Sequence, residues 1–362
     1  MRVLLSGGGT AGHVNPAIAI AKYISQKDPA SEILFVGTKN GIEHSLVPRE
    51  GFDIKYIEVA GLKRKLTFQN LKVVFKAIKA YHDSKKIIKQ FNPDIVIGTS
   101  GYVCAPVLYA AHRKNIPIMV HEQNVFPGLV VRLLAKYADV TAVSFEETEN
   151  YLKNPKCVKV TGNPIRQAIL DIKNDSKVPG EPKVVIYGGS LGANKLNNAL
   201  LELLELEGQG YYGVIAATGE RNYEKFKEKL REKNITPGDN KVICPYIYDM
   251  DKALAEADIA VTRAGAITIS ELCAIGKPAI IIPSPNVVNN HQLYNARYME
   301  KTGGAVVILE EDLNGKILAE QIKTLISNPE ILRKMSAAAK KIGITTACEE
   351  IYSLAEGLIK AR

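Results

Sequence analysis

Short apolar runs and helix-length amphipathic segments alternate along almost the whole chain. An apolar run at 3–5 leads into four glycines within residues 7–12, and apolar residues then recur at helical spacing from Ala17. This pattern predicts a strand, a glycine-rich turn and a helix. The same succession returns at 94–106 and at 183–200. Repeated units of this kind predict an α/β protein built on doubly wound, Rossmann-like parallel sheets.

The pattern also places a domain boundary near the middle of the chain. A turn at 162–166 precedes the polar segment 173–182, whose two prolines and one glycine are typical of a linker. We therefore expect one domain at 1–163 and a second at 164–343, with a C-terminal helix at about 344–362 that packs back on the first. Further strands are predicted at 32–36, 53–59, 116–120, 138–143, 157–160, 213–217, 241–244, 258–261 and 277–283, and a long helix at 67–90.

The bulk composition is that of an ordinary globular protein. The 362 residues are 46% apolar and 23% charged, and no apolar run approaches the roughly 20 residues that a spanning helix needs. The N-terminal residues lack the layout of a signal peptide, and the five cysteines include no C-x-x-C pair. These features predict a cytoplasmic protein with free thiols and argue against a structural zinc site.

The basic charge is concentrated in the first half of the chain. Residues 1–163 hold 22 Lys and Arg against 13 Asp and Glu, whereas residues 164–362 are balanced. Within the first half, residues 61–89 carry nine basic side chains and one acidic one. This segment predicts an anionic partner. Apolar residues lie among the lysines at helical spacing, so the alternative is a helix that packs its apolar stripe on the sheet and leaves the lysines in solvent.

The first glycine-rich turn predicts an anion site with a titratable group beside it. Uncovered N–H groups at a helix N-terminus favour a phosphate, and His13 follows the last glycine. A dinucleotide site would also need an acidic residue at the end of the second strand, but 37–40 holds none. A nicotinamide dehydrogenase is therefore disfavoured. For His13, the alternative to a catalytic role is a helix N-terminal residue bonded to the backbone.

Seven motifs follow one another over essentially the whole chain: Gly8–Pro16, Gly101–Pro106, His121–Asn124, Gly162–Arg166, Gly188–Ala193, Arg263–Glu271 and His291–Gln292. In this order and at this spacing they resemble the MurG family of glycosyltransferases. The resemblance implies a GT-B fold, in which two Rossmann-like domains face each other across a cleft, with the acceptor on the first and the sugar nucleotide mainly on the second. It implies inverting transfer of N-acetylglucosamine from UDP-N-acetylglucosamine to the 4-hydroxyl of the N-acetylmuramoyl(pentapeptide) of undecaprenyl-linked lipid I, giving lipid II for peptidoglycan.

The resemblance also implies roles for individual residues. His13 would be the general base or orient the acceptor hydroxyl, with Glu122 as the next candidate base. Ser190 and the loop of Gly265, Ala266, Ile267, Thr268, Ile269 and Ser270 would hold the donor diphosphate, Glu271 the ribose, Ile247 the uracil, and Gln292 and Asn124 the sugar. Near the diphosphate and sugar would lie Thr10, Ala11, Gly12, Arg166, Arg263 and His291. The acceptor would meet Gly8, Gly9, Gly98, Ser100, Gly101, Tyr102 and Glu122.

Several of these residues have structural alternatives. Thr268 to Glu271 also fits an S/T-x-x-E capping box, Gln292 could be a solvated helix residue, and Arg263 could form a strand-end ion pair. The sequence also departs from the family, which often has glycine at positions 11 and 100 and serine at position 264. Here these positions are Ala11, Ser100 and Ala264. The methyl group of Ala11 and the hydroxymethyl group of Ser100 would narrow their loops.

A lipid-linked acceptor implies a peripheral enzyme on the cytoplasmic face of the cell membrane, with possible contacts to cell-wall or division machinery and none to nucleic acid. The expected docking face comprises Lys63, Arg64, Lys65, Leu66, Phe68, Leu71, Lys72, Phe75 and Ile78. No Asp-x-Asp metal motif is present, so we expect no essential metal or other cofactor. Two further functions stay open: a UDP-N-acetylglucosamine 2-epimerase and a non-catalytic nucleotide-sugar sensor.

Overall fold

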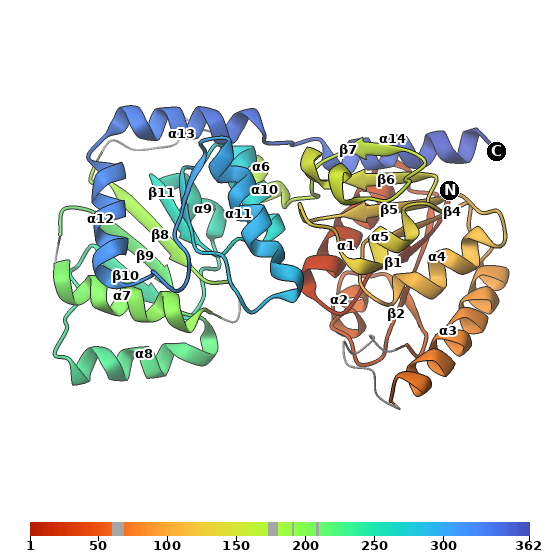
Figure 1. Ribbon diagram of the computed structural model, residues 1–362, viewed down its shortest axis with the longest axis horizontal. Coiled ribbons are helices and arrows are strands. Elements are labelled where there is room, and N and C mark those ends of the chain that lie inside the picture. The colour runs from red at the N-terminus through yellow and green to blue at the C-terminus, as the bar shows by residue number, and fades with distance from the viewer. Residues whose placement is uncertain (60–68, 173–179, 190–191, 208–209) are drawn as a thin grey trace. The chain divides into compact units, whose positions relative to one another are not determined.

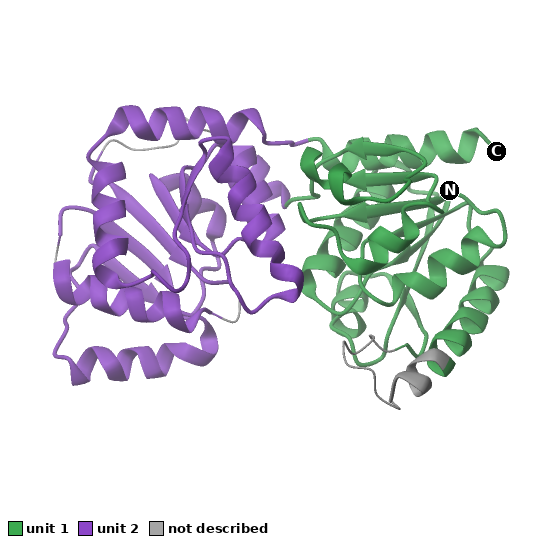
Figure 2. Ribbon diagram, in the orientation of Figure 1, with its two compact units in different colours: residues 1–165, 346–362 green, residues 166–345 purple. Residues whose placement is uncertain are grey.

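The protein forms two compact units, each with its own parallel sheet (Figures 1 and 2). The computed structural model describes residues 1–59, 69–172, 180–189, 192–207 and 210–362, and the side chains of 69–74 are not described. Unit 1 is Met1–Ile165 with Thr346–Arg362, and unit 2 is Arg166–Thr345. Both divisions fall close to the boundaries expected from the sequence, and the C-terminal segment belongs to unit 1.

The described residues of unit 1 form a seven-stranded parallel sheet in the order β3-β2-β1-β4-β5-β6-β7. The order reverses between β1 and β4, and ligands of open α/β sheets bind at such a switch point, beyond the carboxyl ends of the strands. The strands are β1 Arg2–Ser6, β2 Glu32–Gly37, β3 Asp53–Tyr56, β4 Ile95–Gly98, β5 Ile118–Glu122, β6 Val140–Val143 and β7 Val158–Val160. The helices are α1 Ala11–Lys27, α2 Glu43–Arg49, α3 Gln69–Phe91, α4 Cys104–His112, α5 Leu129–Leu134, the 3₁₀ turn η1 Glu146–Tyr151 and α14 Ala347–Lys360.

Both faces of the central strands β1, β4, β5 and β6 are buried, which explains why these strands are mainly apolar at successive positions. Val3 and Leu5 point into a core that also holds residues of α1 and α14, whereas Leu4 points into the core formed with α4. The alternation follows from the two-residue period of a strand. The sheet is therefore held rigidly between two helical layers, and the turns at its carboxyl edge start from fixed positions.

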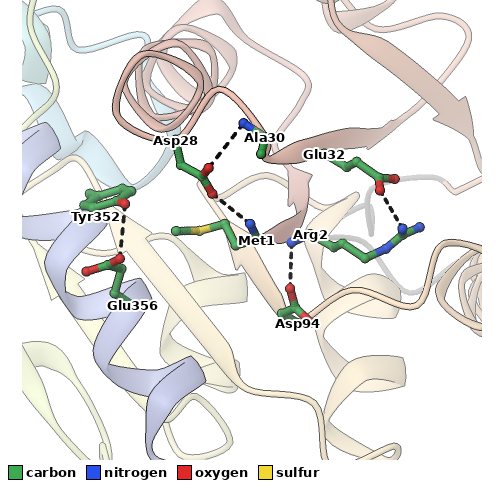
Figure 3. A network of polar contacts seen from close by, with 8 residues as sticks. All are labelled: Met1, Arg2, Asp28, Ala30, Glu32, Asp94, Tyr352 and Glu356. Carbon is green, nitrogen blue, oxygen red and sulfur yellow. Dashed lines mark hydrogen bonds and ion pairs between the residues drawn. The ribbon is translucent and has the colours of Figure 1, made fainter.

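The C-terminal helix α14 completes the core on the α1 side. Ile351 and Ala355 are fully buried there, and the ring of Tyr352 meets that of Tyr23 edge-on, with centroids 6.0 Å apart. Figure 3 shows Tyr352 beside the polar contacts that fix the amino end of β1. In that network Asp28 accepts a hydrogen bond from the Met1 amino group (2.8 Å), and Asp94 accepts one from the Arg2 amide (2.7 Å).

Unit 2 has a six-stranded parallel sheet, within the described residues, in the order β10-β9-β8-β11-β12-β13. Its strands are β8 Lys183–Tyr187, β9 Gly213–Ala217, β10 Lys241–Cys244, β11 Ile259–Thr262, β12 Ala279–Ile281 and β13 Ala305–Val307. Its helices are α6 Gln167–Leu170, α7 Asn194–Glu207, α8 Glu220–Glu232, α9 Met250–Glu256, α10 Ala266–Ile275, the 3₁₀ turn η3 Val288–Asn290, α11 His291–Lys301, α12 Gly315–Ile326 and α13 Pro329–Lys341. The doubly wound fold class is confirmed, and β13 is the one described strand that the sequence pattern did not predict.

Candidate active site

The glycine-rich turn of unit 1 packs directly on the turn that follows β4. Gly9 and Gly101 both have left-handed backbone angles, with φ of +86° and +92°. A side chain at Gly101 would place its Cβ 2.4 Å from the Gly8 carbonyl oxygen, so only glycine fits there. Ser100 also has a positive φ, of +77°, which is uncommon for a residue with a side chain. Of the three departures from the family pattern, only this one carries backbone strain.

His13 lies in the first turn of α1 and is bonded to the turn before it. Its Nδ1 is 3.0 Å from the carbonyl oxygen of Gly8. Because a carbonyl can only accept, Nδ1 carries the hydrogen and Nε2 keeps its lone pair. Burial lowers the pKa of His13 below its ordinary value. The imidazole is therefore neutral near pH 7, which is the state that a general base needs. The backbone bond and the catalytic role are compatible.

A buried carboxylate beside this turn was missed by the sequence analysis. Glu43, at the start of α2, accepts hydrogen bonds from the amide of Gly9 (3.1 Å) and from both the amide and the hydroxyl of Thr38 (2.9 and 2.7 Å). Its side chain is 1% exposed. The amide of Gly9, a residue expected to meet the acceptor, thus donates to a protein carboxylate. The only sequence signal for this carboxylate site was a pair of glycines, Gly37 and Gly41, shortly before Glu43.

The His121–Asn124 motif forms a buried polar network at the end of β5. The carboxylate of Glu122 is fully buried and accepts hydrogen bonds from the amide (2.9 Å) and side chain (3.1 Å) of Asn124 and from the amide of Gly128 (2.8 Å). Burial raises the pKa of Glu122. Its oxygens are already engaged, which fits a role in orienting Asn124 better than a role as base.

His121 holds the turn that ends unit 1. Its Nε2–H donates to the carbonyl of Gly162 (2.9 Å), and its Nδ1 accepts from the side chain of Gln123 (2.9 Å). Complete burial lowers the pKa of His121 to about 4, so this imidazole stays neutral. With both nitrogens occupied, His121 is structural. Of the remaining acceptor residues, Gly98 packs against Leu108, whereas the Tyr102 ring lies beside Gly9 and is partly exposed.

Unit 2 contains a pocket of about 490 Å³ at the carboxyl edge of its sheet. The glycine turn after β8 and the N-terminus of α10 form its walls. Helix α10 begins at Ala266, with Gly265 as its N-cap. The first amides of such a helix have no partner within the helix and suit a diphosphate. The lining residues are Gly188, Gly189, Gly192, Ala193, Asn194, Lys195, Thr262, Arg263, Gly265, Thr268, Ser284, Asn286, Gln292 and Glu310. Ser190 lies outside the described residues.

Two of the predicted donor residues in this pocket are held by protein groups. Arg263 donates to the carbonyl of Ile282 (3.1 Å) and pairs with the carboxylate of Glu310, so the strand-end ion pair is present. Gln292 accepts a hydrogen bond from the amide of Ser284 (2.8 Å) through its side-chain oxygen. This bond uses only the side-chain oxygen of Gln292, a residue that also lines the pocket. Gln292 is therefore not a solvated helix residue.

Glu271 is paired with Arg166. The two carboxylate oxygens lie 2.9 and 3.3 Å from the Nε and Nη2 atoms of Arg166, a bidentate arrangement. The capping-box alternative for Thr268 and Glu271 is wrong, because α10 begins before Thr268 and Glu271 falls in the second turn. The nearby phenol of Tyr187 is buried, which raises its pKa. A ribose bound by Glu271 would have to share the carboxylate with Arg166.

The remaining predicted residues are not among the described residues that line this pocket. Ile247 is buried, and the rings of its sequence neighbours Tyr246 and Tyr248 contact each other with centroids 5.0 Å apart. His291 donates from Nδ1 to the carbonyl of Val288 (2.8 Å). Ile267, Ile269 and Ser270 belong to α10, while Thr10, Ala11, Gly12 and Asn124 belong to unit 1. In the described part of the chain, no three His, Cys, Asp or Glu side chains are grouped to hold a metal ion, and no helix is long and apolar enough to cross a membrane.

Two doubly wound sheets, each with a glycine-rich turn at its carboxyl edge, define the architecture of GT-B glycosyltransferases. Residues 3–143 match the glycosyltransferase family 28 N-terminal domain, and residues 183–351 match the family 28 C-terminal domain. The chain belongs to glycosyltransferase family 28.

Related proteins match this chain over nearly its full length. The chain is 49% identical over 360 residues to a protein of Caldanaerobacter subterraneus subsp. tengcongensis (98% of this chain, 99% of that one) and 49% identical over 368 residues to one of Acetivibrio thermocellus (99% of each). Both are named UDP-N-acetylglucosamine–N-acetylmuramyl-(pentapeptide) pyrophosphoryl-undecaprenol N-acetylglucosamine transferase. Among solved structures, Acinetobacter baumannii MurG matches with a TM-score of 0.83 at 28% identity (98% and 99% of the two chains).

An enzyme of a different class shares only the fold. A UDP-GlcNAc 2-epimerase from Neisseria meningitidis matches with a TM-score of 0.66 at 13% identity, over 98% of this chain and 99% of that one.

Proposed function

We propose that this protein transfers N-acetylglucosamine from UDP-N-acetylglucosamine to the 4-hydroxyl of the N-acetylmuramoyl sugar of lipid I, with inversion, and so forms lipid II. The observation that carries the proposal is the full-length similarity, at 49% identity, to proteins named for this activity. The presence of the His13 turn in unit 1 and the glycine-lined pocket in unit 2 agrees with it.

The chemistry needs a group that accepts the proton of the attacking hydroxyl and groups that stabilise the departing UDP. We assign the first role to His13, whose neutral imidazole keeps a lone pair on Nε2. The N-terminal amides of α10, from Ala266 onward, would stabilise the charge that develops on the diphosphate. Inverting displacement requires one base and no second carboxylate nucleophile. On this account turnover needs no metal ion.

We further propose that unit 1 docks on the cytoplasmic surface of the membrane through α3, α4 and α5. The exposed fractions of Phe75 and Ile78 on α3 are 68% and 52%, and those of Leu129 and Leu133 on α5 are 51% and 58%. Helix α4 contacts both of these helices and adds the partly exposed ring of Tyr109. At Phe75 and Ile78, the alternative that the stripe packs on the sheet is wrong.

The surroundings of this apolar surface are basic. Lys85 lies over the ring of Tyr81 and Lys136 over the ring of Tyr137, as at membrane interfaces where aromatic rings and cations gather. Lys76 and Lys79 pair with Glu58, which reduces their contribution to an anionic surface. The other predicted docking residues, Lys63, Arg64, Lys65, Leu66 and Phe68, lie outside the described residues, as do the side chains of Leu71 and Lys72.

Incubation with labelled UDP-N-acetylglucosamine, with and without a lipid I analogue, tests the proposed reaction. We expect labelled lipid product only when the acceptor is present. Conversion of the sugar nucleotide to its 2-epimer without acceptor would instead establish an epimerase. Binding without turnover in either tube would establish a sensor.

A further inference from the structure

Glu43 has no direct role in the proposed transfer, yet unit 1 encloses its carboxylate closely. A Cβ built on Gly8, Gly37 or Gly41 would lie 2.6, 2.6 or 2.2 Å from an atom of the Glu43 side chain. Three glycines, one in the turn after β1 and two between β2 and α2, thus leave space for one buried carboxylate. Burying a charge is costly unless it is hydrogen-bonded, and here three donors, from Thr38 and Gly9, meet the two oxygens.

A single peptide group connects Glu43 to His13. The amide N–H of Gly9 donates to Glu43 Oε2 (3.1 Å), and the carbonyl of Gly8 accepts from His13 Nδ1 (3.0 Å). That N–H and that carbonyl belong to the same peptide bond. A carboxylate on the N–H side polarises the peptide and makes its carbonyl oxygen a stronger acceptor for the imidazole.

We propose that Glu43 is a positioning residue for the transfer reaction: through the Gly8–Gly9 peptide group it fixes the orientation of His13 and increases the basicity of Nε2. The arrangement parallels a carboxylate hydrogen-bonded directly to a catalytic histidine, with a peptide bond inserted between the two groups. This inference rests on the proposed function, since it assumes that His13 serves the glycosyl transfer.

Electrostatics point in the same direction. The negative charge of Glu43 raises the pKa of His13, although the larger effect of burial lowers it overall. Removing the charge should therefore lower the pKa of His13 further. Two other titratable side chains, Tyr102 and Cys104, lie around the turn. Burial raises the pKa of the Cys104 thiol to about 12, so its charge does not change between pH 5 and 9.

The test uses Glu43→Gln, which keeps the volume but cannot accept hydrogen bonds at both side-chain positions. We expect kcat to fall about tenfold to a hundredfold, with KM for UDP-N-acetylglucosamine unchanged. The NMR titration of the His13 ring, identified by its loss in His13→Ala, should move to lower pH. The acid limb of the kcat/KM profile should move with it.

Asp139→Asn is the matched control. Asp139 also accepts a backbone hydrogen bond in unit 1, from the amide of Ile118 (2.9 Å), and pairs with Lys156 on the surface. Loss of stability is expected from both variants, but only Glu43→Gln should shift the His13 titration. An unchanged His13 titration, or equal kcat losses in the two variants, would overturn the inference. If the wild type fails to transfer sugar at all, the proposed function fails, while the NMR titration still decides whether Glu43 acts on His13.

Discussion

The glycine-rich turns after β1 and β8 both connect a strand to a helix, but different groups occupy the space beside them. The turn after β1 is filled by protein groups: Glu43 takes the amide of Gly9, and His13 takes the carbonyl of Gly8. The turn after β8 borders an open pocket of about 490 Å³ beside the N-terminus of α10. A glycine turn at a helix N-terminus can therefore hold either a phosphate or a side chain of the protein itself.

The largest expected effect comes from removing the base in unit 1. His13→Ala should lower kcat by roughly 10²- to 10⁴-fold, the range for a positioned general base, while UDP affinity stays near wild type. Steady-state kinetics and isothermal titration with UDP measure the two quantities separately. A near-normal kcat would remove His13 from the mechanism, and neither glycine-rich turn would then supply a general base.

Gly101→Ala should distort the glycine-rich turn after β1, on which Gly101 packs, and leave the turn after β8 unchanged. The new Cβ would meet the Gly8 carbonyl at 2.4 Å, and the backbone at φ +92° disfavours any side chain. Strain on the order of 1–3 kcal/mol is expected, with a lower kcat and an unchanged UDP affinity. Gly357→Ala, where an added Cβ meets nothing within 4 Å, is the control for a change in the same unit. Comparable losses in both variants would refute a specific role for this turn.

Glu271→Gln should act on the second unit. The change removes the charged partner of Arg166 and replaces a charged acceptor for the ribose by a weaker neutral one. UDP affinity should fall about tenfold, with kcat at saturating donor little altered. The side chain of Arg166 is 54% exposed, so solvent screens the ion pair and the melting temperature should change little. Unchanged affinity would mean that the pair with Arg166 is the only role of Glu271.

Replacing Phe75 and Ile78 together by serine should weaken binding to anionic vesicles several-fold and raise KM only for membrane-embedded acceptor. Both side chains are largely exposed, so little stability should be lost. Leu206→Ser, a change of an exposed leucine of unit 2, serves as the control.

Charge reversal of Lys63, Arg64, Lys65 and Lys72 should also weaken vesicle binding, and high salt should have the same effect on the wild type. Vesicle binding that survives these changes would locate the docking surface elsewhere.

The smallest effect is expected from chelation. If helix N-termini and polar side chains stabilise the departing diphosphate, turnover in EDTA should equal turnover in buffer. An activity lost in EDTA and restored by magnesium would show that the pocket of unit 2 works with a metal ion.

Much of the fold could be predicted because strands of a buried parallel sheet carry runs of consecutive apolar residues. The strands at Glu32–Gly37, Gly213–Ala217 and Lys241–Cys244 lie where the pattern placed them. Strand β13, Ala305–Val307, could not be recognised because three residues after two glycines carry too little periodicity.

The site could be predicted only as far as its local motifs extend. His13 and the N-terminus of α10 lie within continuous glycine-containing segments, so their neighbours in space are also their neighbours in sequence. Glu43 accepts from a residue 34 positions away, and Arg166 pairs with Glu271 across 105 positions. Such partners depend on how the strands and helices are packed, which no local pattern encodes.

The stereochemistry of the product tests the central claim most directly. The wild-type enzyme is incubated with UDP-N-acetylglucosamine, in which the sugar is α-linked, and a lipid I analogue, and the new glycosidic bond is assigned by NMR. A single base on the acceptor side predicts a β-linkage, because the hydroxyl attacks opposite the departing diphosphate. An α-linked product would contradict the account, since retention requires a different set of groups.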